Sequence, residues 1–122
     1  MCGLVVMLCV MDDVKCEQII MISWTTSSMD EARKVGRYLI QENLAACVNI
    51  TPWTESVYQW QGELHIDQEV KVHIKTLHKH QFKIREVIVK HTDYDVPEII
   101  SHDIELLHAE YDSWFREQCQ KK

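Results

Sequence analysis

Apolar and polar residues alternate along the middle of the chain. Beyond Gly62, the apolar side chains share one face of an extended segment: Leu64, Ile66, Val70, Val72 and Ile74. The polar side chains share the other face: Glu63, His65, Asp67, Glu69, Lys71, His73 and Lys75. A period of two predicts a strand. The segment Gln61-Gly62-Glu63 predicts a tight turn from a preceding strand over 57–60, because glycine readily takes a positive φ.

Two large aromatic residues share a face of the incoming strand. Tyr58 and Trp60 are two positions apart, so their rings lie on the same side and near the ionisable face of the hairpin. Such rings either pack in a core or a subunit contact, or they line a ligand site. The residue types favour the packing role.

The first half of the chain predicts a strand, a helix and a second strand. The continuous apolar run 19–25 is typical of a strand that is buried on both faces. Ser28 and Glu31 form a capping box for a helix that ends near Asn43. Its buried side is expected to hold Ala32, Val35, Gly36, Leu39 and Ile40. The next strand spans 45–50.

The remaining segments complete the pattern. Pro52 predicts a bend or bulge before the strand resumes toward Tyr58, since proline cannot donate to a strand ladder. A helix is expected over about 79–90, then a short strand over 98–101 and a last helix over about 108–118. The apolar side of the 79–90 helix is expected to hold Phe82, Ile84, Val87, Ile88 and Val89.

The order β-α-β-β-α-β with an added C-terminal helix predicts an α+β protein. Its sheet is antiparallel and carries both main helices on one face. Residues 17–122 are expected to form a single domain, and 1–16 a loose N-terminal extension. The apolar stretch 3–11 is too short to span a bilayer and lacks preceding basic residues, so no membrane partner is expected.

Composition excludes several classes of function. The net charge is −6 and no run of Lys or Arg forms a basic stripe, so nucleic acid is not an expected partner. The chain has five scattered cysteines and no CxxC pair, which indicates reduced thiols in a cytoplasmic protein. No nucleophile–base pair, phosphate loop or dinucleotide fingerprint is present, so we expect no enzyme activity.

Four motifs together resemble those of the CutA family of divalent-cation-tolerance proteins. They are Leu44-Ala-Ala-Cys-Val-Asn49, Tyr58-x-Trp60-x-Gly62, Glu69-x5-Lys75-Thr76 and Tyr94-x2-Pro97-Glu98-Ile99. The likeness runs from about residue 19 to 115, and four motifs in register are unlikely by chance. It implies a ferredoxin-like fold with an extended hairpin, a homotrimer whose hairpins pair edge to edge, and a role in divalent metal tolerance or response.

The resemblance also implies a candidate site for copper or another divalent cation. The resemblance implies a copper site made of one thiol at the end of the first strand and two adjacent histidines after the second helix. Those positions hold Trp24, His91 and Thr92 in this chain, so only His91 remains. Cys47 is a second candidate metal ligand because its thiol is soft. The alternatives are a helix C-terminal histidine and a small buried cysteine, and both stay open.

An intersubunit ligand pocket is the other candidate site. It is expected where the hairpin, the exit of the second helix and the last strand converge. Its candidate residues are Cys47, Tyr58, Trp60, Glu69, Lys75 and Tyr94, with His91 beside them. Glu69 and Lys75 are six residues apart and so lie on the same side of a strand. The alternative for this pair is a set of solvated ion pairs of little energetic value.

A second class of function fits the same expected shape. A small-molecule-sensing regulatory trimer of nitrogen-regulator-like architecture also assembles through such a sheet. Its long ligand-responsive loop has no counterpart at Gln61-Gly62-Glu63. The primary prediction is therefore a cytoplasmic, CutA-like homotrimer, and the regulatory trimer is the alternative.

Overall fold

The computed structural model describes residues 17–120, so the predicted extension over 1–16 lies outside the described residues. The elements in chain order are β1 (Ile19–Thr26), α2 (Met29–Gln41), β2 (Cys47–Trp60), β3 (Glu63–Leu77), the 3-10 turn η1 (His78–His80), α3 (Gln81–His91), β4 (Ile99–Asp103) and α4 (Ala109–Gln118).

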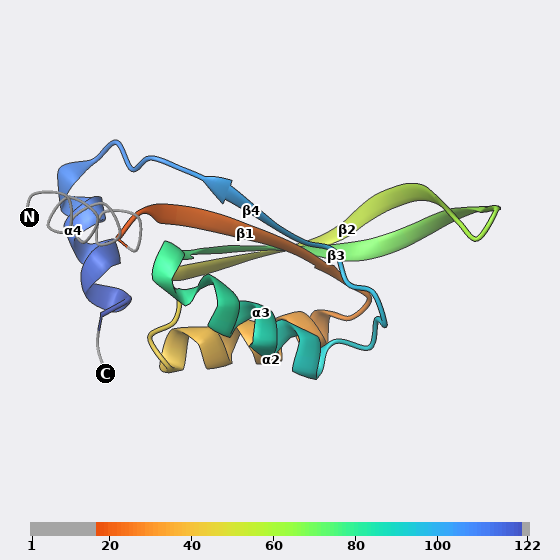
Figure 1. The fold of residues 1–122 in the computed structure, drawn as a ribbon, viewed down its shortest axis with the longest axis horizontal. Coiled ribbons are helices and arrows are strands. Elements are labelled where there is room, and N and C mark those ends of the chain that lie inside the picture. Colours follow the sequence, from red (N-terminus) through yellow and green to blue (C-terminus); the bar gives the residue numbers. More distant parts are fainter. Residues whose placement is uncertain (1–16, 121–122) are drawn as a thin grey trace, which may run out of the picture.

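Four strands form one antiparallel sheet in the order β2-β3-β1-β4. Helices α2 and α3 lie side by side against one face of this sheet, and α4 lies beyond the end where β1 begins (Figure 1). The predicted α+β class is confirmed, with the strand order of a ferredoxin-like fold.

The core lies between the sheet and the helix pair. It combines alternate residues of β1 and β3 with the inner positions of α2 and α3, and its fully buried members include Ile20, Ile22, Trp24, Val35, Leu39, Val72, Ile74, Ile84 and Ile88. The opposite face carries a smaller cluster, in which Phe115 of α4 packs with Ile19, Ala46, Leu77 and Cys119. Helix α4 therefore covers only one end of that face.

The local signals for helix α2 hold at Ser28 and Asn43, whereas the predicted capping box is only half formed. Ser28 Oγ accepts a hydrogen bond from the backbone N–H of Glu31, as a helix N-cap should. The Glu31 carboxylate accepts from the Thr26 hydroxyl instead of closing the capping box on Ser28. Asn43 has φ 58°, and this left-handed residue ends the helix as predicted.

The β2–β3 hairpin extends well past the rest of the sheet (Figure 1). Strand β1 pairs with β3 only from Leu77 back to Val70, whereas β2 and β3 continue together to Trp60 and Glu63. Gln61 and Gly62 form the turn with φ 53° and 82°, the positive values of a type I′ hairpin loop. The predicted bulge at Pro52 appears as a register shift between Thr51 and Thr54.

Three predicted core positions are wrong. Ile40, Phe82 and Val89 lie at the edges of the buried faces of α2 and α3, where no neighbouring element of the described chain covers them, and they are therefore exposed. The Phe82 ring instead lies 5.1 Å from the Arg85 guanidinium on the outer surface of α3. The predicted 98–101 strand begins one residue later and is longer, and the predicted second helix is preceded by η1.

Candidate functional site

A cleft lies at the root of the hairpin, where β2 and β3 leave the shelter of β1. The segment between α3 and β4 forms its second wall. The cleft has a volume of about 600 Å³ and is lined by Thr25, Ser56, Val57, Tyr58, Trp60, Glu69, Tyr94, Asp95, Val96 and Glu98. We call it the hairpin-root cleft.

Glu69 is the buried acid of this cleft. Its side chain belongs to the polar face of β3, yet the residue is only 8% exposed because the segment after α3 crosses over it. The Tyr94 hydroxyl donates a hydrogen bond of 2.6 Å to Glu69 Oε2. Burial, and then this bond to the carboxylate, raise the pKa of Tyr94 well above its ordinary value, so the hydroxyl keeps its proton.

A second tyrosine–carboxylate pair lies farther along the hairpin. The Tyr58 hydroxyl donates to Asp67 on β3, and this bond is the main cause that raises the pKa of Tyr58. The Tyr58 ring stacks on His65 with centroids 5.3 Å apart. Cross-strand pairing therefore holds Tyr58 in place, with one side of its ring occupied.

The wall opposite the hairpin is built by an irregular segment. The backbone N–H of Tyr94 donates to the Thr92 hydroxyl, which turns the chain directly after α3. Pro97 then keeps Val96 out of the helical region. Glu98 ends the segment, and its carboxylate lies 3.4 Å from the ammonium group of Lys71. Asp95 and Val96 are thereby presented to the cleft.

The structure brings together four of the predicted pocket residues. Tyr58, Trp60, Glu69 and Tyr94 all line the hairpin-root cleft within one chain. Cys47 and Lys75 are paired with each other across β2 and β3 but do not line it. Because Lys75 is six residues from Glu69, it lies about 20 Å along the strand.

Several lining residues were not predicted from the sequence. Thr25, Ser56, Val57, Asp95, Val96 and Glu98 complete the cleft. A signal for part of this set was present, since Asp95 and Glu98 flank Pro97 in a segment that cannot be helical. Ser56 lies two residues before Tyr58 with no register shift between them, so the strand period offered a signal for it that the prediction did not use. Val57, on the alternate face of the strand, carried no comparable signal.

The described part of one chain does not bring the candidate metal ligands together. His91 Nδ1 lies 2.8 Å from the Val87 carbonyl and donates to it, which leaves Nε2 as one potential ligand. The Cys47 thiol lies 3.8 Å from Asn49 Oδ1, on the sheet face turned away from the helices. Trp24, at the position of the family's thiol, is fully buried in the core. Within residues 17–120, no group of three His, Cys, Asp or Glu side chains could hold an ion. One imidazole and a distant thiol therefore do not fit copper.

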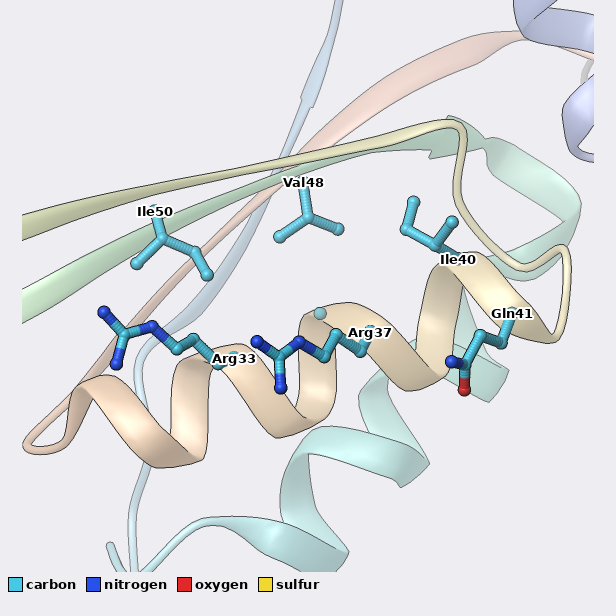
Figure 2. A pocket seen from close by; sticks show the side chains of 7 residues that line it. Arg33, Arg37, Ile40, Gln41, Val48 and Ile50 are labelled. Atoms are coloured by element: carbon cyan, nitrogen blue, oxygen red, sulfur yellow. The ribbon is translucent and has the colours of Figure 1, made fainter.

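A second hollow lies between α2 and the start of β2. Figure 2 shows Val48 and Ile50 pointing from β2 toward the helix, with the Arg33 and Arg37 side chains along the same opening. A Cβ atom on Gly36 would lie 3.2 Å from Val48 Cγ1, so this glycine permits the close approach of helix and strand. The groove has a volume of about 310 Å³, and it also contains the exposed Ile40.

The strand order, the helix pair on one face and the projecting hairpin define a ferredoxin-like α+β protein with a cleft at the hairpin root. The family model described as "CutA1 divalent ion tolerance protein" matches residues 20–118. The chain therefore belongs to the CutA family of divalent-cation-tolerance proteins, as its motifs indicated.

Individual relatives agree with this assignment. The divalent-cation tolerance protein CutA of Thermus thermophilus is 41% identical over 102 residues, which cover 83% of this chain and 96% of the relative. The solved structure of CutA1 from Oryza sativa has a TM-score of 0.81 at 30% identity and covers 88% of this chain and 99% of that one. The chloroplastic CutA of Arabidopsis thaliana is 35% identical, and the match covers 53% of its length.

The family model and the Thermus thermophilus relative are named for divalent ion or divalent-cation tolerance and not for an enzyme activity. A solved CutA structure from Archaeoglobus fulgidus is described as periplasmic, whereas the Arabidopsis thaliana relative is described as chloroplastic, so the family is not confined to one compartment. None of the helices within residues 17–120 is long and apolar enough to cross a membrane. None of these comparisons supports the nitrogen-regulator alternative.

Proposed function

We propose that the protein acts in divalent metal tolerance as a cytoplasmic homotrimer whose functional site is the hairpin-root cleft. Membership of the family supports the role in tolerance, and one observation carries the homotrimer. The hairpin leaves long strand edges unpaired and exposes Val57, Leu64 and Ile66, the last two 68% and 59% exposed. Unpaired strand edges with apolar side chains favour association, so a partner strand is needed to cover them.

The proposed trimer gives these surfaces a partner. Neighbouring copies would pair along the outer edge of β2 and along the part of β3 that β1 does not reach, residues 63–69. The hairpin-root cleft adjoins both edges, so a neighbouring subunit would help to enclose it. Trp60, half exposed in one chain, would become buried at this junction.

The role in tolerance does not depend on a chelating site at His91 and Cys47. These two side chains lie on different layers of the fold, and His91 offers one free ring nitrogen. A single imidazole holds Cu²⁺ or Zn²⁺ weakly. The protein would therefore respond to divalent cations through a ligand of the cleft rather than by sequestering the metal itself.

Growth under metal load tests this proposal. A host that lacks its own CutA protein is grown in copper with the wild type, with the double variant His91→Ala/Cys47→Ala, or with Trp60→Ala. We expect the wild type and the double variant to restore growth equally and Trp60→Ala to fail, because it disrupts assembly and cleft together. Loss of tolerance in the double variant alone would instead assign the role to direct metal binding.

A further inference from the structure

We propose that the hairpin-root cleft binds the positively charged head of an organic ammonium compound. This inference rests on the proposal that the cleft is the functional site, and it names the ligand class. Three features of the cleft support it: its aromatic rings, its excess of negative charge and its size. The negative charge favours a cation, and the rings and the volume favour an organic cation over a metal ion.

The aromatic rings come from both walls. Tyr58 and Trp60 belong to β2, and Tyr94 belongs to the opposite segment. The faces of such rings attract cations, most strongly where the cation is partly shielded from water. The Tyr58 and Tyr94 hydroxyls are committed to Asp67 and Glu69, so these rings are oriented before any ligand arrives.

The charge of the cleft is negative. Glu69, Asp95 and Glu98 are the charged lining residues, and no Lys, Arg or His is among the described residues that line it. Lys71 pairs with Glu98 from outside, which leaves Glu69 and Asp95 without a basic partner among residues 17–120.

Glu69 is the strongest of these acids as a cation partner. The residue is only 8% exposed, and the Tyr94 hydroxyl donates a hydrogen bond to one of its two carboxylate oxygens, Oε2. Its remaining oxygen, Oε1, has no hydrogen-bond partner in the described part of the chain. A carboxylate held in a shielded cleft attracts a cation more strongly than one in water does.

The cleft is larger than a bare metal ion requires, so its size favours an organic ligand. Its volume of about 600 Å³ falls in the range of small-molecule sites, and its lining acids do not converge into a group that could hold a metal. Val57 and Val96 add apolar walls that fit the methyl groups of an alkylated ammonium better than a hydrated ion.

The test compares choline with its uncharged carbon isostere, 3,3-dimethylbutan-1-ol, by isothermal titration into the full-length protein. We expect choline to bind with a Kd below about 1 mM and the isostere to bind at least tenfold more weakly. The two probes share shape and apolar surface, so the difference reports the charge. Equal binding of both probes, or binding of neither, would overturn the inference.

Matched variants locate the site. Glu69→Gln should weaken choline binding tenfold or more, whereas Glu55→Gln, the same change on β2 but outside the cleft, should alter it less than twofold. Thermal melting and light scattering show that each variant is folded and assembled. An effect of Glu55→Gln equal to that of Glu69→Gln would place the binding elsewhere. Failure of choline with an intact trimer would refute this inference alone, whereas a monomeric wild type would refute the proposed function.

Discussion

At the scale of single residues, the contact between Tyr94 and Glu69 decides the form of the cleft. A carboxylate that is removed from water requires hydrogen-bond donors, and the Tyr94 hydroxyl supplies one at 2.6 Å. The same bond fixes the segment after α3 against the hairpin. It therefore links two parts of the chain that are 25 residues apart.

Replacing Tyr94 with Phe should destabilise the protein by about 1–2 kcal/mol, since the buried carboxylate loses its donor while the ring remains. The raised pKa of Tyr94 makes this difference depend on pH. The stabilisation is fully present below about pH 10, the pKa of an unfolded tyrosine, and is lost as the pH rises through the folded-state pKa. Urea unfolding of both proteins at pH 8 and pH 11 measures it. Tyr111→Phe, at an exposed position of α4, is the control and should change little.

Part of the site could be predicted from single residues. Tyr58, Trp60 and Glu69 were predictable because a strand period of two places them on one side of the hairpin. The same rule placed Lys75 with Glu69, but it gives the side of a strand and not the distance along it. Glu69 was expected on the polar face of the hairpin, either in a pocket or in a solvated ion pair, and its burial depends on a segment that is distant in sequence.

At the scale of elements, the hairpin is the part of the fold that sequence predicts best. Alternation fixes its faces, and the turn residues fix its register at Trp60 and Glu63. The buried faces of the helices were predicted less accurately. Periodicity identifies the apolar stripe of a helix but not how much of that stripe a neighbouring element covers. Ile40 and Phe82 illustrate this limit, since both lie at rims that nothing in the described chain covers.

The turn of the hairpin gives a prediction at this scale. Gly62→Ala should cost about 1 kcal/mol of stability, because Gly62 has φ 82° and an L-residue is strained there. The cost is purely one of backbone conformation, since no atom lies within 4 Å of an added Cβ. The free energy of unfolding in urea measures it, with Gln59→Ala as the control on the adjoining strand. A variant as stable as the wild type would show that the turn adopts another conformation.

At the scale of the whole molecule, one copy of the described chain leaves part of its apolar surface and of its strand edges uncovered. The helix-covered half of the sheet has a continuous core, while the hairpin half exposes apolar side chains and unpaired strand edges. A sequence of 122 residues with four tryptophans carries more apolar surface than one copy hides, and Trp60 on the hairpin is half exposed. The proposed assembly of three copies would account for this division, and it would also bring a neighbour to the edge of the hairpin-root cleft.

The mass of the protein in solution tests this claim most directly. Size-exclusion chromatography with light scattering should give three times the 14.4 kDa of one chain and should not change on dilution. Trp60→Ala should weaken assembly by about 3 kcal/mol or more per site, since it removes a large ring from the proposed junction. A wild type that elutes with the mass of one chain would contradict the trimer and the enclosed cleft that depends on it.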